Sequence, residues 1–214
     1  LITTPVDPLN SKVVPSGLVF NSTRDFNVAF PGYSGPASYF VAGLDGTITE
    51  IAPTFAGTTY TTAPAYQAQL AAAVPNAVYT GLTLGSNASG NFLYAANVAG
   101  GRIDIFNDTF QLVSVAGAFA DPTLPAGFTP FNVANINGTL FVTYKSTVTP
   151  DAGGVIDTFD TNGNFLSRFA AGSNLNAPWA VVQAPSGFDS YGNDILVGNF
   201  GDGRISAYDT SGNY

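Results

Sequence analysis

Two asparagines in equivalent stretches of the chain are the first candidates for ligand binding. Asn97 lies in Ala-Asn-Val-Ala-Gly-Gly-Arg and Asn199 in Gly-Asn-Phe-Gly-Asp-Gly-Arg, each shortly before an arginine, Arg102 or Arg204. Such groups around one opening would form a polar ring for a small ligand or for Ca²⁺, which prefers oxygen ligands. The alternative is that each asparagine stabilises a tight turn. Asn132 completes the candidate ligand-binding set.

Composition excludes several kinds of chemistry. The 214 residues contain neither His nor Cys, which removes disulfides, thiol catalysis, the usual zinc sites and His-based triads. Glu50 is the one glutamate, so the sequence offers few residues for the carboxylate cluster that a calcium-dependent lactonase needs. We therefore assign no catalytic residue, metal ligand or cofactor and expect a protein that is not an enzyme. Calcium binding and a lactonase-type hydrolase stay open as alternatives.

Charge and hydropathy exclude two classes of binding partner. The formal net charge is −8 and the six cations are scattered, so the chain lacks the basic patch that nucleic acid or an anionic membrane requires. No apolar run approaches the roughly 18 residues needed to span a bilayer. Only 9% of the residues are charged, and Ser, Thr, Asn and Gly must cover much of the surface. This composition favours a processed, secreted protein, with no signal peptide in the sequence.

The elements that position these residues belong to an internal repeat. One alternating apolar and polar stretch, typical of a half-buried strand, occurs four times with an isoleucine in the same place. Intervals of 55, 53 and 49 residues separate these isoleucines, Ile48, Ile103, Ile156 and Ile205. An apolar strand precedes each stretch, a further strand lies upstream of that, and a turn with a more variable strand follows.

Four strands in about 40–55 residues are typical of a propeller blade, so we predict an all-β, NHL-like β-propeller with about four blades. The alternative is a β-sandwich. One domain or fragment over 1–214 is expected, with 1–12 an outer strand of a preceding or closing blade. The predicted blades are approximately 13–72, 73–120, 121–175 and 176–214. The ring is expected to be incomplete and cut from a longer protein, with open strand edges that would allow self-association.

Several longer motifs resemble one family. They include Phe-Val-Ala-Gly-Leu-Asp-Gly-Thr-Ile (40–48), Leu-Tyr-Ala-Ala-Asn (93–97) and Leu-Val-Gly-Asn-Phe-Gly-Asp-Gly-Arg-Ile (196–205). Residues 118–132 and 175–180 add to the resemblance, which covers essentially the whole chain. The chain is similar to an uncharacterised family of secreted NHL-like propellers, some of which carry a PEP-CTERM sorting tail. The resemblance implies a propeller of about six blades and an extracellular location, and it implies no activity.

Turns supply the remaining candidates. Asp160-Thr-Asn-Gly-Asn and Asp209-Thr-Ser-Gly-Asn resemble the opening of a calcium loop but lack its further ligands, so we predict hairpin turns. Residues 145–153 lengthen a loop on the face that usually holds ligands in propellers. Four Asn-x-Ser/Thr sequons are candidate glycosylation sites in turns of the opposite face: Asn21, Asn87, Asn107 and Asn137.

The function that this sequence favours is that of an extracellular, non-enzymatic binding or structural module with an unidentified ligand. A carbohydrate-binding module is a further alternative, since aromatic side chains can form platforms for sugars. Trp179 is the one tryptophan, and its place on an inner strand predicts that it packs in the core.

Overall fold

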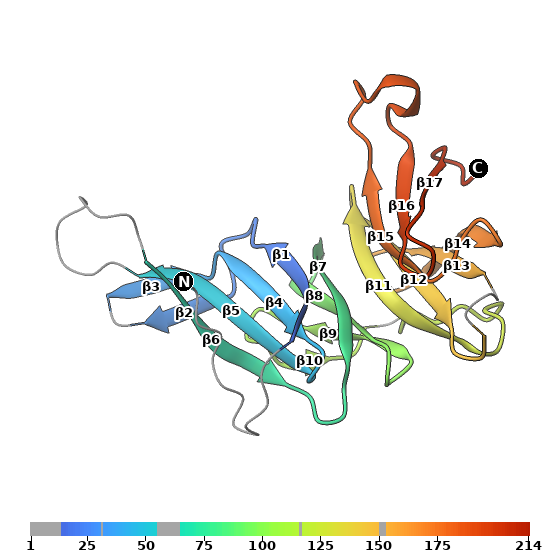
Figure 1. Ribbon diagram of the computed structural model, residues 1–214. Coiled ribbons are helices and arrows are strands. Elements are labelled where there is room, and N and C mark those ends of the chain that lie inside the picture. Colours follow the sequence, from blue (N-terminus) through green and yellow to red (C-terminus); the bar gives the residue numbers. More distant parts are fainter. Residues whose placement is uncertain (1–13, 31, 55–64, 116, 150–152) are drawn as a thin grey trace. The chain divides into compact units, whose positions relative to one another are not determined.

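The computed structural model describes residues 14–30, 32–54, 65–115, 117–149 and 153–214. In these segments the regular elements are seventeen β-strands and one short 3-10 helix at Asp189–Tyr191 (Figure 1). Among the described helices, none has the length and apolarity to cross a membrane. The predicted outer strand at 1–12 lies outside the described residues.

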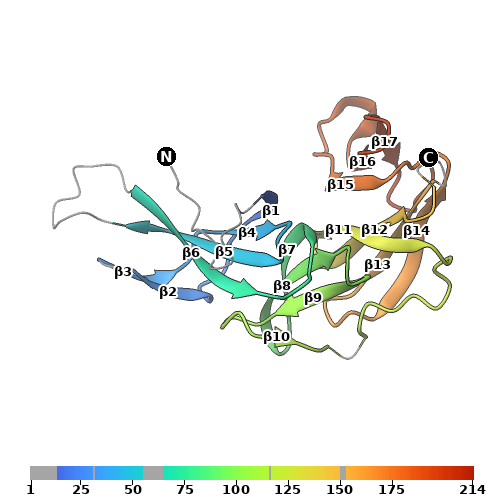
Figure 2. The ribbon, with the colours of Figure 1, turned by 60° about the horizontal axis from the view of Figure 1, so that its bottom comes forward.

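Sheets 1 and 2 are antiparallel and four-stranded, with strand orders β1-β4-β5-β6 and β10-β9-β8-β7. The strands of sheet 1 are β1 (Pro15–Phe20), β4 (Tyr39–Gly43), β5 (Thr47–Thr54) and β6 (Ala65–Ala73). Those of sheet 2 are β7 (Tyr79–Asn87), β8 (Gly90–Asn97), β9 (Arg102–Phe106) and β10 (Leu112–Val113). Between β1 and β4 the chain forms a separate hairpin, seen near β5 in Figure 2, of β2 (Asn27–Phe30) and β3 (Tyr33–Pro36).

Sheets 3 and 4 repeat the pattern, with strand orders β11-β12-β13-β14 and β15-β16-β17. The strands of sheet 3 are β11 (Phe128–Ile136), β12 (Thr139–Ser146), β13 (Gly154–Phe159) and β14 (Phe165–Gly172). Those of sheet 4 are β15 (Pro178–Gln183), β16 (Ile195–Asn199) and β17 (Ile205–Tyr208). Each predicted isoleucine motif thus forms the third strand of a sheet. The prediction of an all-β propeller with four blades is confirmed.

By its internal contacts the chain divides into two units, residues 1–100 with 104–113 and residues 101–103 with 114–214. In the first unit, sheet 1 packs on sheet 2 through a core that includes Phe40, Ile48, Leu82 and Leu93. In the second unit, sheet 3 packs on sheet 4 through an equivalent core of eight buried residues. These are Phe141, Ile156, Phe169, Ala170, Leu175, Ile195, Val197 and Tyr208.

One bulge recurs in the inner strand of all four sheets, the strand that comes first in each. The register with the second strand shifts between Pro15 and Gly17, and at the matching places in β7, β11 and β15. Such bulges bend a strand and increase its twist. The residue after the bulge is small where the sheets meet closely, because a Cβ added to Gly17 would lie 2.8 Å from the backbone nitrogen of Leu82.

Candidate functional site

Asn97 lies almost fully buried at the end of β8, and its amide holds the loop that follows. Its Oδ1 accepts hydrogen bonds from the backbone N–H groups of Val78, at 3.2 Å, and Gly100, at 2.9 Å. Its Nδ2 donates to Asp104 Oδ2 at 2.8 Å, and the Tyr79 hydroxyl donates to the same oxygen at 3.0 Å. The side chain therefore ties the loop between the second and third strands to the inner strand.

Asn199 has the same role in sheet 4. It is buried at the end of β16, and its Oδ1 accepts the backbone N–H of Asn176 at 2.9 Å. Its Nδ2 donates to the Ser206 hydroxyl at 3.0 Å, and this hydroxyl donates to the backbone oxygen of Asn174 at 2.8 Å. The two asparagines thus occupy equivalent places, and both use their amides within the protein to hold neighbouring segments together.

The other three candidates differ in accessibility. Arg102 and Arg204 are exposed. Asn132 is half-buried after the bulge of β11, and its Nδ2 donates to the backbone oxygen of Trp179 at 2.6 Å. This hydrogen bond joins the inner strands of sheets 3 and 4. Arg204 borders a shallow hollow that Trp179 also lines, and Trp179 is only half-buried rather than a core residue as predicted. Ligand binding by these residues stays a prediction.

Sheet 3 departs from this pattern, and the repeat in the sequence does not predict the departure. Tyr144 stands opposite Pro130 where Asn97 and Asn199 stand opposite the first residues of their inner strands. A tyrosine has no amide oxygen to accept backbone N–H groups, so sheet 3 has a different set of polar contacts at this place.

That arrangement is a buried ion-pair network. Asp157 is fully buried in β13, and Arg168 on the neighbouring β14 donates from Nε to Asp157 Oδ1 at 2.6 Å. The same guanidinium also forms an ion pair with Asp121, in the segment before β11. Burial raises the pKa of Asp157 to about 6, although Arg168 opposes this shift. Burial, and then the Asp157 charge, raise the pKa of Tyr144.

The candidate calcium loops are hairpin turns, as predicted. Asp160 Oδ1 accepts the backbone N–H groups of Asn162 and Asn164, and Asp160 Oδ2 accepts the amide of Asn164. Asp209 forms the same turn with Ser211 and Asn213. Their carboxylates therefore stabilise the turns. Within the described segments, no three Asp or Glu residues lie together in a way that could hold a metal ion.

The four sequons lie at strand ends or in the turns that follow them, but in different surroundings. Asn21 is buried, and its Nδ2 donates to the backbone oxygens of Ala37 and Asp25. Asn107 and Asn87 are half-buried, and their Oδ1 atoms accept backbone N–H groups. Asn137, between β11 and β12, is exposed.

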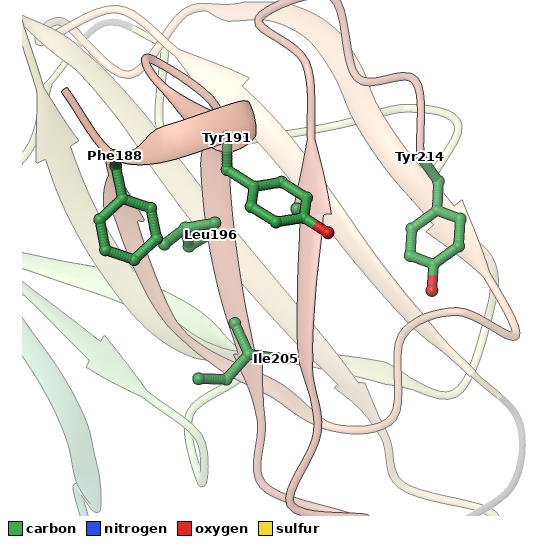
Figure 3. A pocket seen from close by; sticks show the side chains of 6 residues that line it. Phe188, Tyr191, Leu196, Ile205 and Tyr214 are labelled. Atoms are coloured by element: carbon green, nitrogen blue, oxygen red, sulfur yellow. The ribbon is translucent and has the colours of Figure 1, made fainter. Parts of the chain in front are cut away.

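An apolar hollow opens on sheet 4. Its volume is about 520 Å³. The six residues that line it form what we call the apolar face of sheet 4. Figure 3 shows Phe188 beside Leu196, with Ile205 below them on its strand, and Tyr191 extending from the short helical turn on the side of Tyr214. The sixth residue is Ala207.

Comparison with known proteins supports the fold and leaves the activity open. The chain matches no family model. It is 29% identical to the uncharacterised protein R640 of Acanthamoeba polyphaga mimivirus over 95% of this chain and 39% of that protein. It is 32% identical to the uncharacterised protein R648 of the same virus over 64% of this chain and 36% of that protein. The chain thus spans less than two fifths of the curated relatives' length.

Two solved structures have a similar fold. The first is a chain of the nidogen/laminin complex, with a TM-score of 0.53 and 15% identity, covering 80% of this chain and 57% of that one. The second is a candidate 6-phosphogluconolactonase of Bacteroides uniformis, with a TM-score of 0.52 and 14% identity, covering 97% of this chain and 54% of that one. At these identities the likeness concerns the fold alone.

Proposed function

We propose that this protein is an extracellular, non-catalytic β-propeller module that binds a ligand on its surface. The observation that carries the proposal is the use of two equivalent polar positions, in the second and fourth sheets. Asn97 and Asn199, which the repeat places at its loop ends, direct their amides to the protein's own backbone and side chains. Their role is to shape the loops, and the loops then present the surfaces between them.

An extracellular setting is supported by the small charged share of 9% and by the sequon at Asn137, which is exposed in a turn. The NHL-like resemblance agrees with that setting. A lactonase-type hydrolase would instead need carboxylates and amides directed together at a bound calcium ion. The carboxylates of Asp160 and Asp209 accept hydrogen bonds within their own hairpin turns. This favours a structural role for these two residues over calcium binding.

The proposal is tested by measuring turnover and the effect of calcium on thermal unfolding. The purified chain is incubated with a panel of lactones and esters, with calcium or with EDTA, while product formation and the thermal unfolding midpoint are followed. We expect no turnover and no dependence of the midpoint on calcium. Calcium-dependent hydrolysis that disappears in EDTA would overturn the proposal in favour of the lactonase-type enzyme.

A further inference from the structure

A second cavity lies in the second unit, at the loop that follows β12. Its volume is about 330 Å³, within the range of about 300–1,000 Å³ that small-molecule sites occupy. The loop side is formed by Lys145, Ser146, Val148 and Thr149, and Phe200 lies on the other side. We infer that this cavity, the Lys145 pocket, binds a small sugar acid, that is, a sugar ring that carries one carboxylate. The inference rests on the proposed binding function and names its ligand class.

Charge favours an anionic ligand. Lys145 is the ionisable residue among those that line the pocket, and its ammonium group lies 4.5 Å from the centre of the Phe131 ring. The ring holds the ammonium group by a cation–π contact. Among the described residues, no carboxylate forms an ion pair with Lys145. An ammonium group has three N–H donors, so those that point into the pocket can bind a carboxylate.

The neighbouring hydroxyls are also suited to an acceptor-rich ligand. The Ser146 hydroxyl oxygen accepts the backbone N–H groups of Val148 and Thr149, at 3.1 and 3.2 Å, which leaves its own proton to be donated. Thr149 brings a second hydroxyl to the lining. Asn176 also lines the pocket.

The apolar part of the pocket fits the ring of a sugar. Phe200 is 77% exposed, and its ring packs edge-on against Phe131 with 5.9 Å between the ring centres. This contact supports the Phe200 ring while leaving it open to solvent. The face of an aromatic ring carries partial negative charge, which attracts the C–H groups on one side of a sugar. Lys145, the hydroxyls and Phe200 thus supply the three contacts that a uronic acid needs.

The test uses D-glucuronate, D-glucose and acetate as probes on the full chain, with binding measured by saturation-transfer NMR and calorimetry. We expect glucuronate to bind at least tenfold more tightly than glucose, which lacks the carboxylate, and than acetate, which lacks the ring. Lys145→Gln and Phe200→Ala should each weaken glucuronate binding at least tenfold. Arg24→Gln, which removes one positive charge from an exposed site in the first unit, should leave it unchanged.

Unfolding midpoints show whether each variant is folded, and Thr149→Ala provides a milder change in the same pocket. Absence of glucuronate binding, or equal binding by wild type and Lys145→Gln, would overturn the ligand assignment. Equal binding of glucose and glucuronate would overturn the role of charge. These results are distinct from calcium-dependent turnover, which is the outcome that contradicts the proposed function itself.

Discussion

Ile156 and Ile205 occupy the same position in consecutive repeats, yet Ile156 is fully buried and Ile205 is 75% exposed. Ile156 packs against sheet 4 in the core of the second unit, and Ile48 is buried in the same way between sheets 1 and 2. In sheets 1 and 3, the third strand therefore directs its isoleucine toward the following sheet of the same unit. In the described structure no sheet covers Ile205, which lies on the apolar face of sheet 4.

This relationship predicts a large difference between two identical substitutions. Ile156→Ala should reduce the free energy of unfolding by about 2–5 kcal/mol, because it opens a cavity in a packed core. Ile205→Ala should change it by less than about 0.5 kcal/mol, since the side chain is mostly in water. Urea unfolding of both variants followed by circular dichroism provides the measurement. Equal losses would show that Ile205 is covered in solution.

The buried amide of Asn97 predicts a second effect on stability. Asn97→Ala removes the acceptor for Val78 and Gly100 and the donor to Asp104, so buried polar groups lose their partners. Such losses cost about 1–3 kcal/mol in the free energy of unfolding. Asn174→Ala is the matched control, because the Asn174 side chain is exposed. If both variants unfold at the same denaturant concentration, the loop does not depend on the Asn97 amide.

The raised pKa of Asp157 predicts how stability depends on pH. Its folded-state pKa of about 6 lies above the ordinary value of 3.8, so the folded protein holds a proton that the unfolded chain releases. The contribution of this group to stability is therefore fully present below pH 3.8 and is lost as the pH rises through about 6. Between pH 7.5 and 5 the wild type should gain on the order of 1–2 kcal/mol from this group. Asp157→Asn, whose side chain does not titrate, should not show this gain.

Unfolding free energies at both pH values, measured for wild type and for Asp157→Asn, give the comparison. Working above pH 4.5 avoids the opposing effect of Asp121, whose pKa is lowered by hydrogen bonds from Thr123 and by Arg168 against the effect of burial. An identical pH profile for the two proteins would mean that Asp157 stays ionised in the fold because Arg168 outweighs burial.

The strands and the repeat were predictable because their side chains alternate with a period of two and the marker isoleucine recurs. The equivalence of Asn97 and Asn199 followed from the same alignment. The Asp157–Arg168–Asp121 network was not predictable from the sequence, because Asp121 and Arg168 are 47 positions apart and only the folded sheet brings them together. One signal was present in the sequence: Asp157 and Asp104 share the position after the marker isoleucine.

The Lys145 pocket was beyond sequence reasoning for a similar reason. The sequence predicts that the loop after β12 is lengthened on the expected ligand face, but Phe200, on the other side of the pocket, belongs to the next repeat. Packing of sheet 3 on sheet 4, seen in the buried pair Ile156 and Val197, brings the two together. Periodicity predicts which face of a strand is buried, but not which loops converge across two sheets.

The buried state of Asn21 predicts which sequons carry glycans. Both hydrogens of its Nδ2 serve hydrogen bonds, to Ala37 at 2.9 Å and Asp25 at 3.1 Å, so a sugar attached there is incompatible with the native turn. Asn137 is exposed, and its Nδ2 uses one hydrogen for an exposed hydrogen bond to Gln183 Oε1 at 3.0 Å, so the other is open to a glycan. After expression in a eukaryotic secretory host, mass spectrometry of folded protein should find glycan at Asn137 and none at Asn21.

Two variants complete this test. Asn137→Gln should reduce the glycan mass, whereas Asn21→Gln should leave the glycan mass unchanged and lower the unfolding midpoint, because the longer side chain does not match the buried turn. Glycosylated Asn21 in folded protein would contradict the prediction, because the β1–β2 loop would then have to open in solution. An unmodified Asn137 in secreted protein would instead remove one support for the extracellular proposal.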